Sequence, residues 1–583
     1  MAFLTKISHK RSSPTIEFAY QNTPRLLSHN NFQAPNIRIP RKNWSINTSD
    51  RLKQCSNPSK TNQYFCNHMN SIIVEQEDND VKHAELVKRV RKLIGKVSDE
   101  GFEDLMMIDA LQRLAIDYHF EDEINLILER RNMQYTNTDF FQHQNLYEIS
   151  LCFRILRQNG FFVLPDYFKK FKGNYKEFDR KLNYDIRGLM ALYEASQLRI
   201  EGEIILDEAE KFSYQILQER MKFLDDEQAT MVRRTLENPC HKTLPFCSLK
   251  NSIRDYNGTV LQELAELEFN LLQYVHQREI NQILRWSKDL GLAKELFLAR
   301  DQPLKCYLWA MAALTNPNLS THRIDLTKTI LLIYIIDDIF DVYGTINELT
   351  VFTEAINRWD IKAIDKLPDY MKSSFKALYN ITNEIANNVY EQHGINPIRS
   401  LWKAWATLCN AFLVEAKWFA SGQIPNADEY LKIGMVTSGV GVLFVHMFFL
   451  LGNGTNEGHY DLFNDNHGII SSVSKILRLW DDLGSARDEN QDGHDGSYIT
   501  CFLNEHQGCP SKVARQHVVN LISDAWKSLN KECLAPYPFS ATFMKATNNI
   551  ARMVPLMYSY DNHSSLPLLD DYVKAILLEN STM

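Results

Sequence analysis

The sequence is poor in the two residues that interrupt regular backbone. Only 22 glycines and 18 prolines occur in 583 residues, and no segment sustains the two-residue alternation of apolar and polar side chains that is typical of strands. A β-rich protein of this length would need more turn residues. Apolar residues instead recur at helical spacing from residue 81 onward. The sequence therefore predicts an all-α fold.

Other features are missing as well. No run of eighteen apolar residues occurs, so no membrane span is expected. The ten cysteines include no C-x-x-C pair, which favours free thiols over a zinc site or a disulfide framework. The net charge of −8 argues against nucleic acid as the main partner. There is also no glycine-rich phosphate loop of either common type.

Acidic residues are scarce near the N-terminus. Residues 1–70 hold ten Lys/Arg but only Glu17 and Asp50, a net charge of +8, which leaves −16 for the rest of the chain. Ser, Thr and Asn are abundant there, and no apolar core of the secretory type is present. This composition is typical of an organelle transit peptide. We expect a disordered leader that is cleaved off after it directs the protein to plastids. The alternative is a disordered basic arm with no targeting function, on a cytosolic protein.

Two helical arrays follow this leader. The helical periodicity weakens over residues 248–260 and resumes near residue 261. We therefore expect an N-terminal helical domain over 71–255 and a catalytic domain over 256–583.

Helix ends within the first array are also predicted. Helices are expected to end near Gly160 and to break at Gly202. Another helix is expected to carry five residues on one face: Ile108, Leu111, Leu114, Ala115 and Tyr118.

Three acids follow directly after an apolar segment in "LLIYIIDDIFDVYG". They are Asp337, Asp338 and Asp341, and on a helix the first and the last point the same way. Burying carboxylates without a partner is costly. Carboxylate oxygens are hard ligands that suit Mg²⁺ or Mn²⁺. We therefore expect a metal site at the end of a core helix, although this motif alone also fits an acidic helix end on the surface.

A second cluster of oxygen ligands favours the metal site. In "ILRLWDDLGSARDEN", Asp481, Ser485 and Glu489 are spaced at i, i+4 and i+8, and Arg478 lies one turn earlier. Two such clusters with arginine nearby would suit a polyphosphate bridged to several metal ions.

Two residues upstream could complete such a site. Arg300 is a candidate clamp for a diphosphate. Trp309 could pack in the core, or it could stabilise a carbocation through its π face.

The combination resembles the plant terpene synthases from about residue 80 to residue 583. The resemblance is carried by "IDALQRLAIDYHFEDEI", "FRILRQNGF", "LYEASQLRIEGEIILDEA", "RWSKDLGL", "DDIFDVYGT" and "RLWDDLGSARDE". It implies an all-α fold with an N-terminal barrel-like helical domain and a C-terminal catalytic bundle. It also implies a prenyl diphosphate substrate, Mg²⁺ or Mn²⁺ as cofactor with three ions per site, and a monomer.

The same resemblance assigns roles to residues. It implies that metal is held by Asp337, Asp338, Asp341, Asp481, Ser485 and Glu489. It implies substrate diphosphate contacts from Arg300, Asp337, Asp341, Arg478 and Asp481. It makes Asp337, Asp341, Arg300 and Trp309 the catalytic set, with Trp309 as the aromatic of the cavity wall.

Two departures from the family pattern bear on the product. The usual Arg-x-Arg upstream of the first metal motif is Arg300-Asp301-Gln302 here, and Gln302 lacks the charge and fork geometry of arginine. Monoterpene cyclases carry two arginines followed eight residues later by Trp, but no Trp lies between Trp44 and Trp286. Both features, with "DENQDGHDGSY", resemble the acyclic branch that makes linalool or nerolidol.

We therefore expect geranyl diphosphate to be converted to linalool, with nerolidol from farnesyl diphosphate. The alternatives are an acyclic olefin such as myrcene or ocimene, a cyclic terpene, a chain-elongating prenyltransferase and a non-catalytic helical scaffold. A prenyltransferase usually needs a second D-D-x-x-D motif, and two metal-ligand clusters have no role in a scaffold.

Several further residues are candidates for the cavity or its lid. Gly439 and Gly441 could break a helix and turn carbonyls toward the cation, or could allow close helix packing. The remaining candidates are lid residues and a loop histidine that could contact diphosphate: Tyr558, Tyr560, Asp561 and His494.

Overall fold

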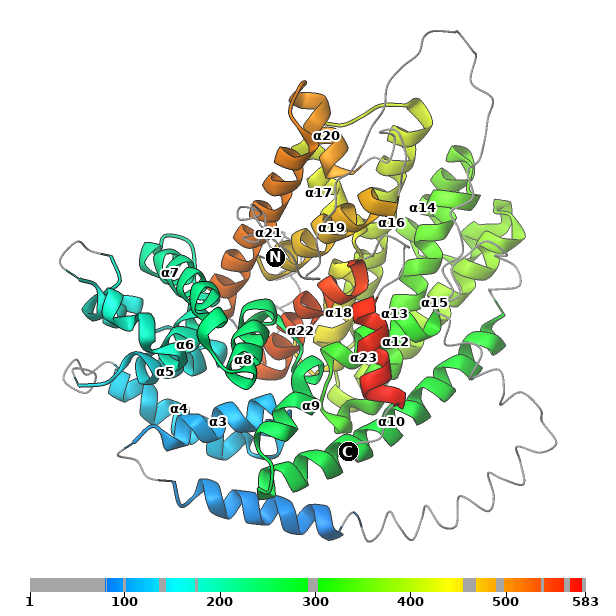
Figure 1. Cartoon of the computed structure of the whole chain (residues 1–583). Coiled ribbons are helices and arrows are strands. Elements are labelled where there is room, and N and C mark those ends of the chain that lie inside the picture. Colours follow the sequence, from blue (N-terminus) through cyan, green and yellow to red (C-terminus); the bar gives the residue numbers. More distant parts are fainter. Residues whose placement is uncertain are drawn as a thin grey trace. The chain divides into compact units, whose positions relative to one another are not determined.

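The structure is a computed structural model, and its regular elements are helices. It describes residues 79, 81–97, 101–135, 143–173, 177–291, 302–454, 468–488, 497–535, 539–559 and 567–578. Within these ranges no strand occurs, and the single extended pairing is an isolated bridge between Lys172 and Phe178. The all-α fold expected from the sequence is confirmed (Figure 1).

The first array consists of short helices joined by 3₁₀ turns. Its helices are residues 81–94, α3 (Glu103–Arg113), α4 (Glu121–Tyr135), α5 (Leu146–Gln158), α6 (Ile186–Ser196), α7 (Ile204–Arg220), α8 (Asp226–Glu237) and α9 (Pro245–Asp255). Side-chain caps define several starts. Asn145 and Glu148 form a capping box at α5, and the Asp225 carboxylate accepts from the Gln228 amide at α8.

The helix ends expected near Gly160 and Gly202 are confirmed. The single helix expected to carry residues from Ile108 to Tyr118 on one face is wrong. α5 ends at Gln158 just before Gly160, and Gly202 lies between α6 and α7. α3, however, ends at Arg113. Ala115 has a left-handed backbone (φ 54°), and Tyr118 lies in the separate 3₁₀ turn η2 (Asp117–His119). The apolar spacing continues through this break because Leu114 and Ile116, on either side of Ala115, are both buried.

The second array begins with the longest described helix. It comprises α10 (Val260–Leu290), α12 (Pro303–Ala313), α13 (Ser320–Asp338), α14 (Ile346–Arg358), α15 (Asp369–His393), α16 (Ile398–Ser421), α17 (Ala427–Thr437), α18 (Val440–Leu450), α19 (Gly468–Asp488), α20 (Tyr498–Glu505), α21 (Ser511–Cys533), α22 (Ala541–Tyr558) and α23 (Pro567–Val573). Residues 248–260, where we expected a domain boundary, are largely helical because α9 extends to Asp255.

α18 is the central helix of the second array. It packs against α13, α16, α19 and α22, and every residue from Val442 to Leu450 is buried. Together with α17 it forms the one described stretch, Ala427–Leu450, that is long and apolar enough to cross a membrane by length and composition alone. Most of this stretch is buried among other helices, as expected for the core of a helical bundle.

Gly439 separates α17 from α18. Its backbone is left-handed (φ 75°), and a Cβ placed on it would lie 2.7 Å from Ile333 Cγ2. Both features favour glycine. Gly439 therefore both breaks the helix and allows close packing. The expected orientation of carbonyls toward the cation stays a prediction. Gly441 differs, because a Cβ there would meet nothing within 4 Å.

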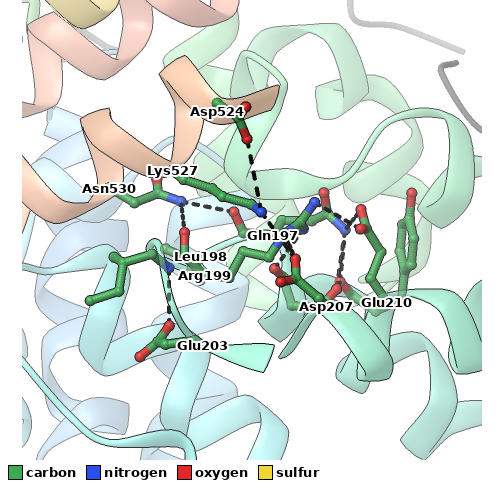
Figure 2. Close-up of polar contacts among 12 residues, drawn as sticks. Gln197, Leu198, Arg199, Glu203, Asp207, Glu210, Asp524, Lys527 and Asn530 are labelled. Atoms are coloured by element: carbon green, nitrogen blue, oxygen red, sulfur yellow. Dashed lines mark hydrogen bonds and ion pairs between the residues drawn. The ribbon is translucent and has the colours of Figure 1, made fainter. Parts of the chain in front are cut away.

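Polar contacts join the two arrays at α21, as Figure 2 shows. The Asn530 side-chain amide donates to the carbonyl oxygens of Gln197 (3.0 Å) and Arg199 (2.9 Å), in the turn after α6. One turn earlier, Lys527 pairs with Asp207 of α7 at 3.2 Å. The Asn530 side-chain oxygen, Oδ1, lies 2.7 Å from Nε2 of buried His241. These bonds fix α21 against the first array.

Candidate active site

The first acidic motif spans a change in helix type. α13 runs as an α-helix to Asp338 and continues as the π-helix η8 (Ile339–Tyr343). Asp337 is half-buried, Asp338 is 3% exposed, and Asp341 is exposed. Asp341 therefore lies in a wider π turn, and the expected α-helical spacing between Asp337 and Asp341 is wrong in this detail. Such π turns are frequent at functional sites.

The second acidic motif surrounds a half-buried guanidinium on α19. Arg478 Nη1 lies 3.2 Å from Asp481 Oδ2 and 3.7 Å from Asp482 Oδ1. Its Nε donates to the carbonyl of Gly434 on α17 (3.3 Å), and Nη2 donates to the Thr437 hydroxyl (3.3 Å). These contacts hold Arg478 in one orientation, with its charge next to Asp481.

Asp482 was not singled out in the sequence, yet its contacts hold the second acidic motif in place. It is 3% exposed and accepts from the Tyr430 hydroxyl and the Tyr498 backbone amide, both at 3.0 Å. Burial raises the pKa of the Asp482 carboxyl to about 7, against the lowering effect of Arg478. In both D-D pairs the second acid is thus buried in the protein, while the first is more accessible.

Glu415 of α16 is influenced by both acidic motifs. We call these motifs the acidic walls of the site: Asp337, Asp338 and Asp341 form one, and Asp481 and Asp482 belong to the other. It accepts from the Thr437 hydroxyl at 2.9 Å. Burial raises its pKa; Arg478 opposes the shift, and the carboxylates of Asp337 and Asp481 add to it. Because carboxylates of α13 and α19 both act on one side chain, the two acidic motifs face a common region. Its sequence signal was a lone acid in the apolar stretch "NAFLVEAKW".

Several expected site residues cannot be placed in this way. Arg300, Glu489, His494, Tyr560, Asp561 and the side chain of Ser485 lie outside the described residues, and their roles stay predictions. Trp309 is buried on α12, which packs against α13 and α22. Tyr558 is half-buried at the end of α22. Gln302 precedes α12, and its Oε1 is buried without a hydrogen-bond partner among the described residues.

The acidic side chains fit a hard divalent cation. Asp337, Asp341 and Asp481 supply carboxylate oxygens, the ligand type that Mg²⁺ prefers. Burial is the main cause of the raised pKa of Glu415, and the neighbouring carboxylates of Asp337 and Asp481 raise it further. Added positive charge would relieve this repulsion. Arg478 beside Asp481 provides a donor for an anionic group bound with the metal.

The fold and this site define an all-α protein with a helical bundle whose acidic side chains fit a divalent metal ion. Comparison with known families gives the identity of the class. Residues 49–237 match the terpene synthase N-terminal domain, and residues 288–528 match the metal-binding domain of the terpene synthase family. The chain belongs to the terpene synthase family, and it is therefore a lyase that acts on prenyl diphosphates.

Individual relatives differ in the product that their names give. The chain is 50% identical to the (E)-nerolidol synthase TPS18VF of Cannabis sativa, over 82% of this chain and 89% of the relative. It is 45% identical to the chloroplastic S-(+)-linalool synthase of Arabidopsis thaliana, over 84% and 87%. Among solved structures, isoprene synthase from grey poplar in complex with three Mg²⁺ ions and dimethylallyl-S-thiolodiphosphate aligns with a TM-score of 0.80 at 36% identity, covering 86% of this chain and 97% of that chain.

Proposed function

We propose that this protein ionises geranyl diphosphate and captures the allylic cation with water, giving linalool. Farnesyl diphosphate would give nerolidol by the same route. The observation that carries the diphosphate chemistry is the pair of acidic walls that act together on Glu415, with Arg478 beside Asp481. The product assignment draws on Gln302, on the missing Arg-Arg…Trp motif, and on the similarity to nerolidol and linalool synthases.

Each wall has a defined part in the first step. We propose Asp337, Asp338 and Asp341 on one side and Asp481, Ser485 and Glu489 on the other as ligands of Mg²⁺ or Mn²⁺. Three ions are proposed, as in the isoprene synthase complex. Bound metal would supply positive charge to the leaving diphosphate. Arg478 and Arg300 would donate hydrogen bonds to the same oxygens, which develop charge as the C–O bond breaks.

The second step takes place on the substrate cation. The electron pair of the broken C–O bond leaves with the diphosphate, and the positive charge is shared between the primary and tertiary ends of the allyl group. A water oxygen bonds to the tertiary carbon and loses a proton, so the chain stays open. Trp309 is proposed to line the cavity, where its π face would stabilise the cation.

Two other outcomes of the same ionisation compete with water capture. Loss of a proton would give an acyclic olefin such as myrcene, and ring closure would give a cyclic terpene. Ring closure first needs the diphosphate to return to the tertiary carbon. We propose that Gln302, which lacks the charge of arginine, weakens the hold on the departed diphosphate and disfavours this return.

The test is incubation of the purified chain with geranyl or farnesyl diphosphate and Mg²⁺ in oxygen-18 water, followed by chiral gas chromatography with mass detection. Labelled linalool and labelled nerolidol are expected. Asp337→Ala should reduce turnover by about 1,000-fold with unchanged circular dichroism, because it removes a proposed metal ligand. Mainly cyclic products such as limonene would contradict the product proposal but leave the metal site intact. Near-normal turnover of Asp337→Ala would contradict the metal site.

We also propose that residues 1–70 direct the protein to plastids. The basic, acid-poor composition supports this, as does the chloroplastic name of the linalool synthase relative. A fluorescent protein fused behind residues 1–70 should enter plastids, and a chain lacking these residues should keep its activity in vitro. Cytosolic fluorescence would contradict the proposal and would favour farnesyl diphosphate as the substrate.

A further inference from the structure

Three side chains from separate elements converge outside the proposed active site. His83 comes from the helix over residues 81–94, His119 from η2, and Glu268 from α10. His83 Nε2 lies 2.6 Å from Glu268 Oε2, and His119 Nε2 lies 3.1 Å from the same oxygen. The two imidazole centroids are 5.0 Å apart. Two ring nitrogens thus converge on one carboxylate oxygen, and the three atoms lie within 4.8 Å of one another.

The surrounding residues hold this arrangement in place. The Tyr118 hydroxyl donates to the other carboxylate oxygen of Glu268, which leaves Oε2 for the two histidines. Arg91 Nη2 donates to the His119 carbonyl at 2.7 Å.

Charge and access both suit a cation at this position. Glu268 is 4% exposed, so its negative charge lies within the protein, where an unbalanced charge is costly. The side chains of His83 and His119 are 19% and 18% exposed, so the cluster can be reached from solvent. The candidate ligand atoms all lie within 4.8 Å of one another.

The donor set differs in kind from that of the acidic walls. Two imidazole nitrogens and one carboxylate are ligands that zinc takes at roughly 2.0–2.2 Å. At such bond lengths the donors would stand roughly 3.3 Å apart, so both nitrogen–oxygen separations, 2.6 Å and 3.1 Å, would widen when an ion is bound. Magnesium prefers oxygen ligands, so the two sites should select different metals.

We propose that His83, His119 and Glu268 bind one zinc-like divalent transition-metal ion. The ion would fasten the helix over residues 81–94 to α10, with the Tyr118 hydroxyl orienting the carboxylate from behind, as partners of metal ligands commonly do. Arg89 of the same helix pairs with Glu263 of α10 at 3.5 Å, on the exposed side. The metal would thus add a strong link beside a weak one.

A metal-free alternative makes a different prediction. Each neutral imidazole could simply donate its Nε2 proton to Glu268, and the three residues would then form a hydrogen-bonded cluster. Such a cluster needs no metal, and zinc would not raise its stability.

The experiment measures zinc bound to the full chain in excess Mg²⁺, which occupies the oxygen-rich walls. After equilibration with zinc chloride and gel filtration, elemental analysis should find one zinc per wild-type chain. Zinc should also raise the unfolding temperature of the wild type. His83→Gln and His119→Gln should each weaken zinc binding by at least about 100-fold and abolish the thermal shift. His506→Gln, which changes an exposed histidine of the second array, is the matched control.

Cobalt gives an independent readout. Co²⁺ bound by two imidazoles should give a visible absorption band in the wild type and in His506→Gln, but not in the two cluster variants. Circular dichroism shows whether each variant is folded, and two variants on different elements guard against the loss of one. The proposal would be overturned if the wild type bound no zinc, or if it bound the same amount as both folded variants. The metal-free hydrogen-bonded cluster would then explain the arrangement.

Discussion

Arg478 shows how one side chain can be held by several weak contacts at once. Its Nε, Nη1 and Nη2 atoms reach Gly434, Asp481 and Thr437 from a single planar fork. Lysine carries the same charge but cannot make these three contacts together. Arg478→Lys should therefore lower kcat by about 100-fold, with a smaller effect on KM, because charge on the leaving diphosphate is stabilised mainly in the transition state. Steady-state kinetics with geranyl diphosphate measures this.

The matched control is Arg358→Lys. Arg358 is exposed and pairs with Glu354 at 4.0 Å on the surface of α14, so its replacement should leave kcat unchanged. Equal kinetics for Arg478→Lys and the wild type would show that charge alone matters at this position.

Only part of the candidate site could be predicted at the scale of single residues. Asp337 and Asp481 could be picked out because acids directly after an apolar run are unusual. Burial of the adjacent Asp338 and Asp482 could not, because it depends on the fold. Asp482, for example, is bonded to Tyr430, some 50 residues away in the chain. Glu415 was missed for the same reason: its spacing is that of a core position, and only the fold places it near both walls.

Single glycines determine how one element ends and the next begins. Gly439→Ala forces a left-handed backbone on alanine, at about 1–2 kcal/mol, and its Cβ would lie 2.7 Å from Ile333 Cγ2. Gly441→Ala meets nothing within 4 Å and lies in the first turn of α18, so it should be neutral or stabilising by up to about 1 kcal/mol. The unfolding temperature should fall for the first variant only. A fall for both would show that the space beside Gly441 is needed.

The link between α21 and the first array depends on the amide of Asn530. Asn530→Ala removes the partner of two carbonyls and of His241, and should lower the free energy of unfolding by about 3 kcal/mol. Asn530→Asp should cost at least as much, because a carboxylate oxygen would replace the donor between two carbonyl oxygens. Thermal unfolding measures both variants.

Asn520→Asp provides the comparison on the same helix. Asn520 is exposed on α21 and accepts only from Gln516, at 3.2 Å, in the part of the chain that the structure describes. Its unfolding temperature should match that of the wild type. A similar loss for Asn520→Asp and Asn530→Asp would mean that added charge on α21, and not the buried amide, explains the effect.

Element boundaries were predictable where a local signal marks them. Gly160 and Gly202 lie at helix ends because both have positive φ, which glycine adopts easily. The break at Ala115 was not predictable, since alanine favours helix and its left-handed backbone is imposed by packing. The π-helical turn after Asp338 likewise carries no sequence signal of its own.

Across the whole molecule, buried neutral histidines make stability depend on pH. Burial lowers the pKa of His241 and His276 to about 3 each, with smaller contributions from Arg552 and Arg323, and the pKa of His446 to about 4. An unfolded histidine takes up a proton near pH 6.5, whereas these folded ones do not. The stability that these histidines contribute is therefore fully present above about pH 6.5, and it is lost as the pH falls toward their folded pKa values of about 3 to 4.

His446→Gln isolates one of these contributions. At pH 5 the shift of His446 costs about 2 kcal/mol relative to pH 7, so the variant should lose about that much less stability between the two pH values. Chemical unfolding at pH 7 and pH 5 measures this, with His506→Gln as the exposed control. The same pH dependence in wild type and His446→Gln would show that His446 is protonated without cost.

The overall class was predictable because many independent patterns agreed on it. Helical periodicity, scarce glycine and several family-like segments all indicated one fold, and the family match confirms it. The contacts that join the arrays were not predictable, since Asn530 bonds to residues more than 330 positions away. The division at residues 255 and 256 stays a prediction.

The buried position of α18 has a consequence for synthesis on the ribosome. Apart from His446 the helix is apolar, and its packing partner α22 begins at Ala541, about 90 residues after α18 ends. At translation rates of 5–20 residues per second, α18 is made roughly 5–20 s before α22 can cover it. During that interval the nascent chain exposes an apolar segment, so we expect a chaperone to bind this stretch.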